Sequence, residues 1–450
     1  MHVFLTRLIV NRFRSVPFAI QSALMAAFLL AVAAPAQAQA PTQRSIVIPS
    51  SSHANAADLG ANAHTNIRYA DAAVPLPNAA PNYAEAEETP QSIACLYGVV
   101  QSSYGCNPAT ATNTPSGGSQ TIAIVDAFDD PNAASDLANF SAQWGVPFKA
   151  DKFKVIYAGG SEPAPDPTGG WEIEEATDIE YAHSMAPNAM LYLVEANSDS
   201  YTDLFTAVQV ANNLVLCGKT KTCPKDSKGK GEVSMSWGGS EFTSAPGQPS
   251  ENSYDPIMTT TGVVYFAAAG DYPGPEYPCV SPNVVCAGGT SDSRNEVTGN
   301  LNAQITWQDG GGGISSYETT PSYQSSLRYQ LGGQRGVPDL SADSNPYTGV
   351  WVLDTYPIPG AGWYTVGGTS VATPVLAGVV NAAGNFASST NAELTTLYGE
   401  LYSGAFTPIT YGACGYYSST FASNGWDQCT GLGTPANLGG NGGIGGEGHF

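Results

Sequence analysis

The sequence has 450 residues, enough for two or three average domains or for one large α/β domain. Its 16 Lys and Arg against 38 Asp and Glu give a formal net charge of -22, so it lacks the positive surface that binds nucleic acid or anionic lipid. A hydrophobic fraction of 42% and 23 Tyr exclude a disordered acidic tail. Only 12% of the residues are charged, about half the share usual in globular proteins.

The first forty residues have the pattern of a secretory signal peptide. Three arginines precede an apolar stretch over residues 19–34, which is too short for a comfortable membrane span, and small residues follow over 35–40. We therefore expect residues 1–40 to be removed as a signal, the alternative being an anchored N-terminal helix. The rest of the protein would then be secreted or periplasmic, with no attachment to the membrane.

Cysteine usage agrees with export to an oxidising compartment. The eight cysteines lie as near neighbours in the sequence: Cys95 with Cys106, Cys217 with Cys223, Cys279 with Cys286, and Cys414 with Cys429. Eight cysteines allow about 105 pairings, so the connectivity stays open and local pairing is the simplest hypothesis. None has the CxxC spacing typical of a zinc site.

The rest of the chain divides into three parts by composition. Residues 41–89 are rich in Ala, Asn, Pro and Ser and have little periodicity, so we expect a short spacer or propeptide that is disordered. Residues 90–437 show the pattern of a single large folded domain, and residues 438–450 form a Gly-rich tail.

Within the folded part, apolar β-rich runs alternate with helical patterns. In chain order we expect a strand at 121–128, a helix at 135–145, a strand at 153–160, a helix at 171–187, a strand at 189–196, a helix at 200–215, and strands at 232–239 and 262–271. This alternation predicts an α/β fold whose mostly parallel sheet is covered by helices on both faces. Active sites of such sheets lie at the carboxyl ends of the strands.

Ser370 is the candidate nucleophile. It follows a strand at 363–366 and two glycines, and it opens a helical pattern in which Pro374 lies early enough to be tolerated. A serine at a helix N-terminus has backbone N–H groups and the positive end of the helix dipole beside its hydroxyl. The commoner role of such a serine is an ordinary N-cap, so a catalytic role requires a base.

His183 is the one histidine of the predicted folded domain, since the other four lie in the signal, the spacer and the tail. A Ser-His-Asp triad of Asp126, His183 and Ser370 is therefore one alternative. However, His183 lacks the His-Gly-Thr context of a subtilisin-type triad, and the interpretation as a structural helix histidine is favoured.

The helix expected at 171–187 offers a different base. Glu174 and Asp178 are four residues apart, so both carboxyl groups lie on one helix face. Two carboxylates in a partly buried site would share a proton, with one apparent pKa raised. Such a pair can accept the proton of a serine hydroxyl in acid, where imidazole is protonated. The alternative is a solvated acidic face, which is what we expect for the neighbouring Glu172, Glu175 and Glu180.

These motifs resemble the sedolisins, or serine-carboxyl peptidases, which are acid-active endopeptidases and tripeptidyl-peptidases on a subtilisin-like fold. The segments that carry the resemblance are Glu-x-x-x-Asp at 174–178 with the following IEYAHSMAPNAMLYLVEA, SMSWGGSE at 234–241, AAAGDYPGPEYP with Asp271, SPNVVCAGGTS, RGVPDLSAD at 335–343, and GGTS at 367–370 with Pro374. They occur in the family's order. The resemblance implies a subtilisin-like peptidase domain over residues 90–437.

The resemblance also implies a role for each catalytic residue. Ser370 would attack the scissile carbonyl, Glu174 would take and later return its proton, and Asp178 would orient Glu174. A protonated Asp271 would donate a hydrogen bond to the oxyanion, together with the Ser370 N–H.

Two further features are implied around these four residues. Asp126 would be a supporting acid, the alternative being a turn-forming residue beside its acidic neighbours. The edge formed by Ser236, Trp237 and Gly238 would pair with the extended backbone of a substrate.

The sequence departs from the family in two places. Many members begin with a large folded prodomain, whereas fewer than fifty residues separate the expected signal cleavage from Thr89. The family's calcium site begins with Asp-Ile, whereas Pro408 precedes Ile409 here. Ligands that remain for one structural Ca2+ are Asp427 and the carbonyls of Ile409, Ser423 and Gly425, and a disulfide between Cys414 and Cys429 would be an alternative staple of the same loop.

We therefore expect a secreted, acid-active serine-type peptidase that acts as a monomer on proteins and peptides, needs no cofactor for its chemistry and binds no nucleic acid. Tripeptidyl-peptidase action is a variant of this hypothesis. The alternatives are a subtilisin-type protease that uses His183 and an inactive binding module on the same fold. Since few cations are present to repel one another once carboxylates are protonated, we also expect the chain to stay folded in acid.

Overall fold

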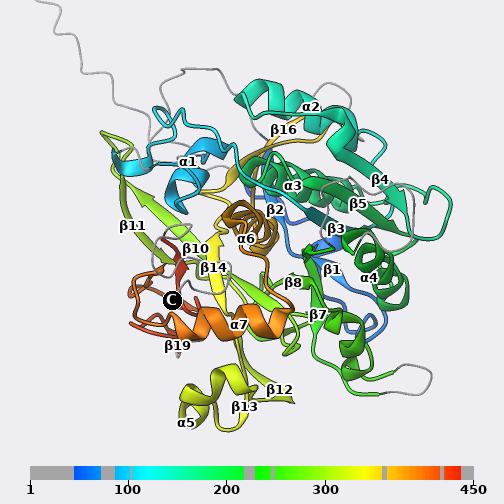
Figure 1. The fold of residues 1–450 in the computed structure, drawn as a ribbon, viewed down its shortest axis with the longest axis vertical. Helices are drawn as coiled ribbons and strands as arrows, with labels where there is room; N and C mark the ends of the chain where they lie inside the picture. Colours follow the sequence, from blue (N-terminus) through cyan, green and yellow to red (C-terminus); the bar gives the residue numbers. More distant parts are fainter. Residues whose placement is uncertain are drawn as a thin grey trace, which may run out of the picture. The chain divides into compact units, whose positions relative to one another are not determined.

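In the described part of the chain, a mostly parallel sheet of eight strands forms the centre of the computed structural model (Figure 1). The strands follow the order β11-β10-β8-β6-β3-β5-β4, and β14 also pairs with β10. Neighbouring strands are parallel, except that β10 and β11 are antiparallel. The bounds are β3 Thr121–Ala127, β4 Phe153–Tyr157, β5 Met190–Ala196, β6 Gly231–Met235, β8 Val263–Ala268, β10 Val285–Arg294, β11 Leu301–Thr306 and β14 Leu340–Asp343. The structure describes residues 45–71, 87–101, 104–216, 229–244, 249–356, 362–415 and 420–436.

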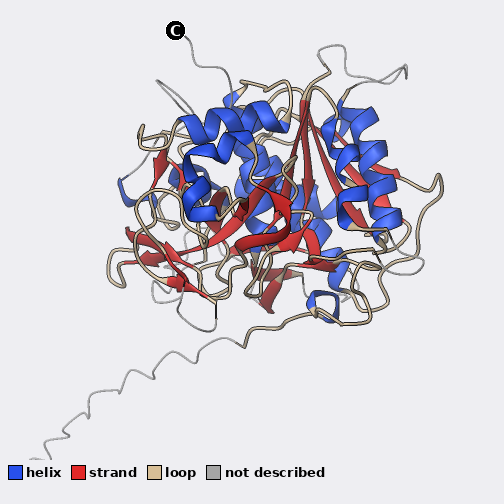
Figure 2. Ribbon diagram, turned by 90° about the horizontal axis from the view of Figure 1, so that it is seen from below, coloured by secondary structure: helices blue, strands red, loops and turns tan. Residues whose placement is uncertain are grey.

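Helices cover both faces of this sheet, and Figure 2 shows the strands between helical layers. On one face, Ile122 and Ile124 of β3 pack with α2 (Ala133–Trp144) and α3 (Gly170–Met185). On the other face, Val125 of β3 packs with α4 (Tyr201–Val215). The further helices are α1 Pro90–Leu96, α5 Arg328–Leu331, α6 Thr369–Ala383, which contacts α3, and α7 Thr390–Gly399. The expected α/β sheet with helices on both faces is therefore confirmed.

Several small antiparallel sheets surround the central one. Their strands are β1 His64–Thr65 with β7 Trp237–Ser240 and β9 Glu276–Tyr277; β2 Arg68–Asp71 with β16 Trp363–Gly367 and β15 Val350–Leu353; β12 Gly313–Thr319 with β13 Gln334–Val337; β17 Phe406–Thr407 with β20 Thr434–Pro435; and β18 Ala413–Cys414 with β19 Thr420–Phe421. The strand expected at 232–239 is thus two strands, β6 and β7, which are separated at Ser236.

Residues 45–71, which the composition suggested were disordered, are ordered. We call them the N-terminal segment. Its strand β1 pairs with β7, its strand β2 pairs with β16, and Ile67 between them is fully buried. The composition was misleading here because the hydrogen-bond partners and the apolar neighbours of the segment belong to strands that lie far away in the sequence.

The helix α3 is buried along its whole length, which corrects the expectation of a solvated acidic face at Glu172, Glu175 and Glu180. Neighbouring segments surround the helix, and some of their backbone donors satisfy its acids. The backbone N–H of Asp166 donates to Glu172 (2.8 Å), and that of Leu353 donates to Glu180 (3.1 Å). The periodicity of the helix itself contains no information about these distant donors.

Three of the four expected disulfides are confirmed: Cys95 with Cys106, Cys279 with Cys286, and Cys414 with Cys429. The fourth expected pair, Cys217 with Cys223, lies outside the described residues, as do the expected signal peptide and the Gly-rich tail. Among the described helices, none combines the length and the apolar character that crossing a membrane requires.

Candidate active site

Ser370 lies at the N-terminus of α6, directly after β16 and two glycines. Its side chain is fully buried, and its hydroxyl donates a hydrogen bond to the carbonyl oxygen of Ser236 (2.9 Å). Gly368, which precedes α6, has a φ of 115°. A Cβ at this position would lie only 2.1 Å from the carbonyl oxygen of Asn66. Glycine is therefore required here both for the backbone conformation and for the close approach of another chain segment.

The two acids of α3 lie beside this serine. Glu174 and Asp178 are fully buried, and the hydroxyl of Ser236 donates to Asp178 Oδ1 (2.8 Å). None of the described residues forms a well-directed hydrogen bond with either oxygen of Glu174. Burial raises the pKa of Glu174 well above its ordinary value, the charge of Asp126 raises it further, and the nearby hydroxyl of Ser370 lowers it in part. The serine and Glu174 are thus neighbours without a direct, well-directed hydrogen bond between them.

Asp178 and Asp126 complete a buried acidic group around Glu174. Burial, followed by the charges of Asp126 and Glu174, raises the pKa of Asp178 well above its ordinary value. Asp126 lies in β3, and burial raises its pKa to about 8. Asp126 thus raises the pKa of both other acids, and Glu174 raises that of Asp178, so the three carboxyl groups release their protons one after another.

Asp271 lies just beyond the end of β8, with its side chain buried. Its Oδ1 accepts hydrogen bonds from the backbone N–H (2.8 Å) and the hydroxyl (3.1 Å) of Thr369. Its Oδ2 has no hydrogen-bond partner among the described residues and lies 3.9 Å from Nε of Arg68. Burial raises the pKa of Asp271 to about 6, and the positive charge of Arg68 limits the rise.

The predicted substrate-binding edge is occupied by the chain itself. Trp237 and Gly238 of β7 pair antiparallel with Thr65 and His64 of the N-terminal segment. The backbone N–H of Ser370 then donates to the carbonyl oxygen of Asn66 (3.1 Å). Sequence reasoning missed this part of the site, because no motif distinguishes residues 64–68 from the rest of a segment rich in small and polar residues.

His183 belongs to a different part of α3. It follows Glu174 by nine residues, which is half a turn out of phase in an α-helix and places it on the opposite face. Its ring packs edge-on against Phe148, with ring centroids 5.6 Å apart. Burial lowers the pKa of His183 to about 4. This environment fits the structural role expected for His183 and does not bring it to Ser370.

The contacts of Asp427 give no support to the expected Ca2+ site. Asp427 Oδ1 accepts from the backbone N–H groups of Cys429 (2.8 Å) and Thr430 (2.9 Å), and Oδ2 accepts from the N–H of Ser423 (3.0 Å) and the hydroxyl of Thr430 (3.0 Å). These four bonds use the acceptor positions of the carboxylate. The described residues also contain no group of three or more His, Cys, Asp or Glu that could hold a metal ion. Asp427 therefore stabilises the conformation of its own loop through these four hydrogen bonds.

The sequence profile of the Subtilase family matches residues 156–398, more than half of the chain. The chain belongs to the subtilase family. The subtilase is 29% identical over 351 residues to kumamolisin of Bacillus sp. (strain MN-32), an alignment that covers 72% of this chain and 59% of kumamolisin. It is 23% identical over 361 residues to sedolisin of Pseudomonas sp. (strain 101), which covers 72% of this chain and 57% of sedolisin. These relatives confirm the resemblance to sedolisins that the motifs indicated.

Xanthomonalisin of Xanthomonas sp. (strain T-22) is 24% identical over 413 residues, an alignment that covers 81% of the subtilase and 47% of xanthomonalisin. The subtilase therefore spans about half of the length of the relatives that it matches. Among solved structures, Pseudomonas sedolisin (serine-carboxyl proteinase) complexed with two molecules of pseudo-iodotyrostatin has a TM-score of 0.57 at 20% identity, covering 78% of this chain and 96% of that one. This similarity confirms the subtilisin-like fold.

Proposed function

We propose that this subtilase is a secreted, acid-active serine-carboxyl peptidase that hydrolyses peptide bonds of proteins. The observation that carries the proposal is the meeting of Ser370, at the start of α6, with the buried acids Glu174 and Asp178 of α3. A buried acid pair beside a serine hydroxyl provides a proton acceptor that does not depend on a histidine.

The reaction follows from these positions. With one proton shared between Glu174 and Asp178, Ser370 Oγ attacks the carbonyl carbon of the scissile bond and passes its proton to Glu174. The tetrahedral intermediate then expels the amine, which takes that proton, and leaves an ester on Ser370 that water hydrolyses by the same groups. Asp178, held by the hydroxyl of Ser236, orients Glu174 and shares its charge. Asp126 supports the pair by raising the pKa of both acids.

Two donors would stabilise the oxyanion. The backbone N–H of Ser370 is one of them, and the free Oδ2 of Asp271 becomes the other when it carries a proton. A carboxyl group donates a hydrogen bond only in its neutral form, so the pKa of about 6 at Asp271 makes the site suited to acid.

Endopeptidase action is favoured over tripeptidyl-peptidase action by the path of the N-terminal segment. The backbone continues from Asn66 through β1 to Asn62, which forms an isolated bridge with Ser200, and onward to residue 45. The site therefore accommodates more than three residues on the amino-terminal side of the carbonyl at Ser370. The three confirmed disulfides agree with secretion. The chemistry requires no cofactor, and we propose that the protein acts as a monomer.

Cleavage of a peptide library at low pH tests this function. Ser370→Ala and Glu174→Gln are each expected to lower turnover by at least about three orders of magnitude, as removal of a triad member does. His183→Gln is the matched control on the same helix. A loss below about tenfold in either of the first two variants would overturn the role of that residue. No cleavage by the wild type at any pH would favour an inactive binding module.

A further inference from the structure

Three side chains beside the candidate site surround the guanidinium group of Arg68. Its central carbon lies 5.4 Å from the ring centroid of Tyr272 and 5.2 Å from that of Trp307, and Nη1 forms an ion pair with Asp309. We call Tyr272, Trp307 and Asp309 the arginine cage. Such a set recognises a guanidinium, because aromatic rings attract a cation over their faces and a carboxylate pairs with its charge.

The arginine cage adjoins the oxyanion site. Tyr272 directly follows Asp271 in the chain, and Arg68 Nη2 donates a hydrogen bond to the backbone carbonyl oxygen of Asp271 (2.6 Å). Arg68 Nε lies 3.9 Å from Asp271 Oδ2. A guanidinium in the cage therefore contacts the same residue that stabilises the oxyanion in the proposed mechanism.

The backbone around Arg68 determines which residue of a bound chain enters the cage. The carbonyl oxygen of Asn66 accepts the backbone N–H of Ser370 (3.1 Å), a donor that the proposed mechanism assigns to the reacting carbonyl. Two residues further on, Arg68 pairs with Gly367 of β16. An extended substrate in this register would place the second residue after its scissile bond in the arginine cage.

The contacts of the cage distinguish arginine from other side chains. The Arg68 side chain is only 11% exposed, whereas that of Asp309 is 42% exposed, so the cage opens to solvent on the side of its carboxylate. A lysine would keep the charge but lacks the planar group that stacks on two rings while it donates to a carbonyl. An acidic side chain would be repelled by Asp309.

We propose that the arginine cage is a specificity site, which selects substrates with arginine as the second residue after the scissile bond. The inference rests on the proposed function and defines part of its substrate class. Arg68 occupies the cage in the absence of a substrate, and the arginine of the substrate replaces it. The cage makes and breaks no bond, so its contribution to substrate binding is expected mainly in KM.

The first test is the digestion of a peptide library by the full-length wild type at mildly acid pH, with mass spectrometry of the products. Arginine is expected to be the most enriched residue at the second position after the cut bonds. Cleavage without enrichment of arginine there would overturn this inference and leave the peptidase function standing. Absence of any cleavage would overturn the proposed function, and the inference with it.

Two peptides that differ only at this position measure the contribution of the charge. One carries arginine and the other citrulline, which keeps the length and the planar shape but is uncharged. The value of kcat/KM is expected to be about tenfold higher for the arginine peptide, mainly through a lower KM. Equal values for the two peptides would overturn the proposal.

Variants of Asp309 assign the preference to the cage. The ratio of the two kcat/KM values is expected to fall from about tenfold to about threefold in Asp309→Asn, since the aromatic rings remain. In Asp309→Lys, a third peptide with glutamate at this position is expected to be cleaved better than the arginine peptide. Asp151→Asn is the matched control, because it removes one negative charge from an exposed residue before β4 and should keep the tenfold ratio. A ratio in Asp309→Asn equal to that of the control would contradict the role of Asp309.

Discussion

Thr369 holds Asp271 by two hydrogen bonds to the same carboxyl oxygen, one from its backbone N–H (2.8 Å) and one from its hydroxyl (3.1 Å). This arrangement orients the carboxyl group and leaves Oδ2 beside the carbonyl of Asn66. In the proposed mechanism, the residue that precedes the nucleophile Ser370 therefore positions the second donor to the oxyanion.

A first prediction concerns the proton on Asp271. Asp271→Ala removes a donor and is expected to lower turnover by about two to three orders of magnitude. Wild-type turnover is expected to fall as the pH rises through about 6, because Asp271 loses its proton there. In Asp271→Asn the amide N–H keeps a donor at every pH, so this fall is expected to disappear from the pH profile of turnover. An unchanged profile in Asp271→Asn would show that another group controls it.

A second prediction concerns stability and pH. Burial raises the pKa of Asp126, Glu172 and Asp354 to about 8 each. An acid whose pKa is higher in the folded than in the unfolded chain stabilises the fold fully below its unfolded pKa of about 4, and this stabilisation is lost as the pH rises through the folded value. The melting temperature of Ser370→Ala, which avoids self-digestion, is therefore expected to be higher at pH about 5 than at pH about 8. A maximum at neutral or alkaline pH would contradict this.

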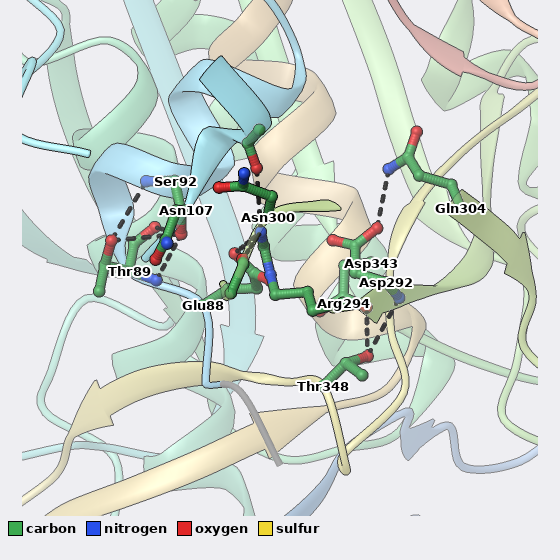
Figure 3. Close-up of polar contacts among 12 residues, drawn as sticks. Glu88, Thr89, Ser92, Asn107, Asp292, Arg294, Asn300, Gln304, Asp343 and Thr348 are labelled. Carbon is green, nitrogen blue, oxygen red and sulfur yellow. Dashed lines mark hydrogen bonds and ion pairs between the residues drawn. The ribbon is translucent and has the colours of Figure 1, made fainter. Parts of the chain in front are cut away.

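A third prediction concerns the buried pair of Glu88 and Arg294 (Figure 3). Arg294→Met leaves Glu88 buried without its cation beside Asp292 and Asp343, and is expected to lower the free energy of unfolding by about 3–5 kcal/mol. Arg328→Met is the control, since this exposed arginine is expected to contribute less than about 0.5 kcal/mol. Urea unfolding of the Ser370→Ala background measures both. Equal effects of the two substitutions would mean that the buried pair has no special role.

A fourth prediction concerns the loop of Asp427. A cation bound only to the folded chain would stabilise it, so its removal would lower the melting temperature. Because the four bonds to Asp427 come from its own loop, a chelator is expected to leave both the melting temperature and turnover unchanged. A clear fall in melting temperature that added Ca2+ reverses would identify a metal ligand set that these contacts do not reveal.

The local parts of the molecule could be predicted from the sequence. Alternation of apolar runs and helical patterns gave the central sheet, since residues such as Ile124 and Val125 are buried on opposite faces of one strand. The spacing of Glu174 and Asp178 predicted that both lie on one face of a helix at 171–187, and the structure has the helix α3 there.

What the sequence did not predict depends on contacts between distant segments. Glu180 is buried because the backbone of Leu353 donates to it, and no pattern within the helix records that partner. Asn66 reaches Ser370 because β1 and β2 pair with strands far along the chain. Pairing of this kind depends on which strand edges of the folded domain still need a partner. A composition rich in Ala and Asn does not indicate it.

The burial of α3 has a consequence for the surrounding solution. Its acids Glu174, Glu175, Asp178 and Glu180 all have pKa values well above their ordinary ones in the folded chain, chiefly because they are buried. In the unfolded chain near neutrality, the same groups would be ionised. Folding therefore takes up protons, so a weakly buffered sample becomes more alkaline as the chain folds. The heat of folding then depends on the ionisation enthalpy of the buffer that supplies those protons.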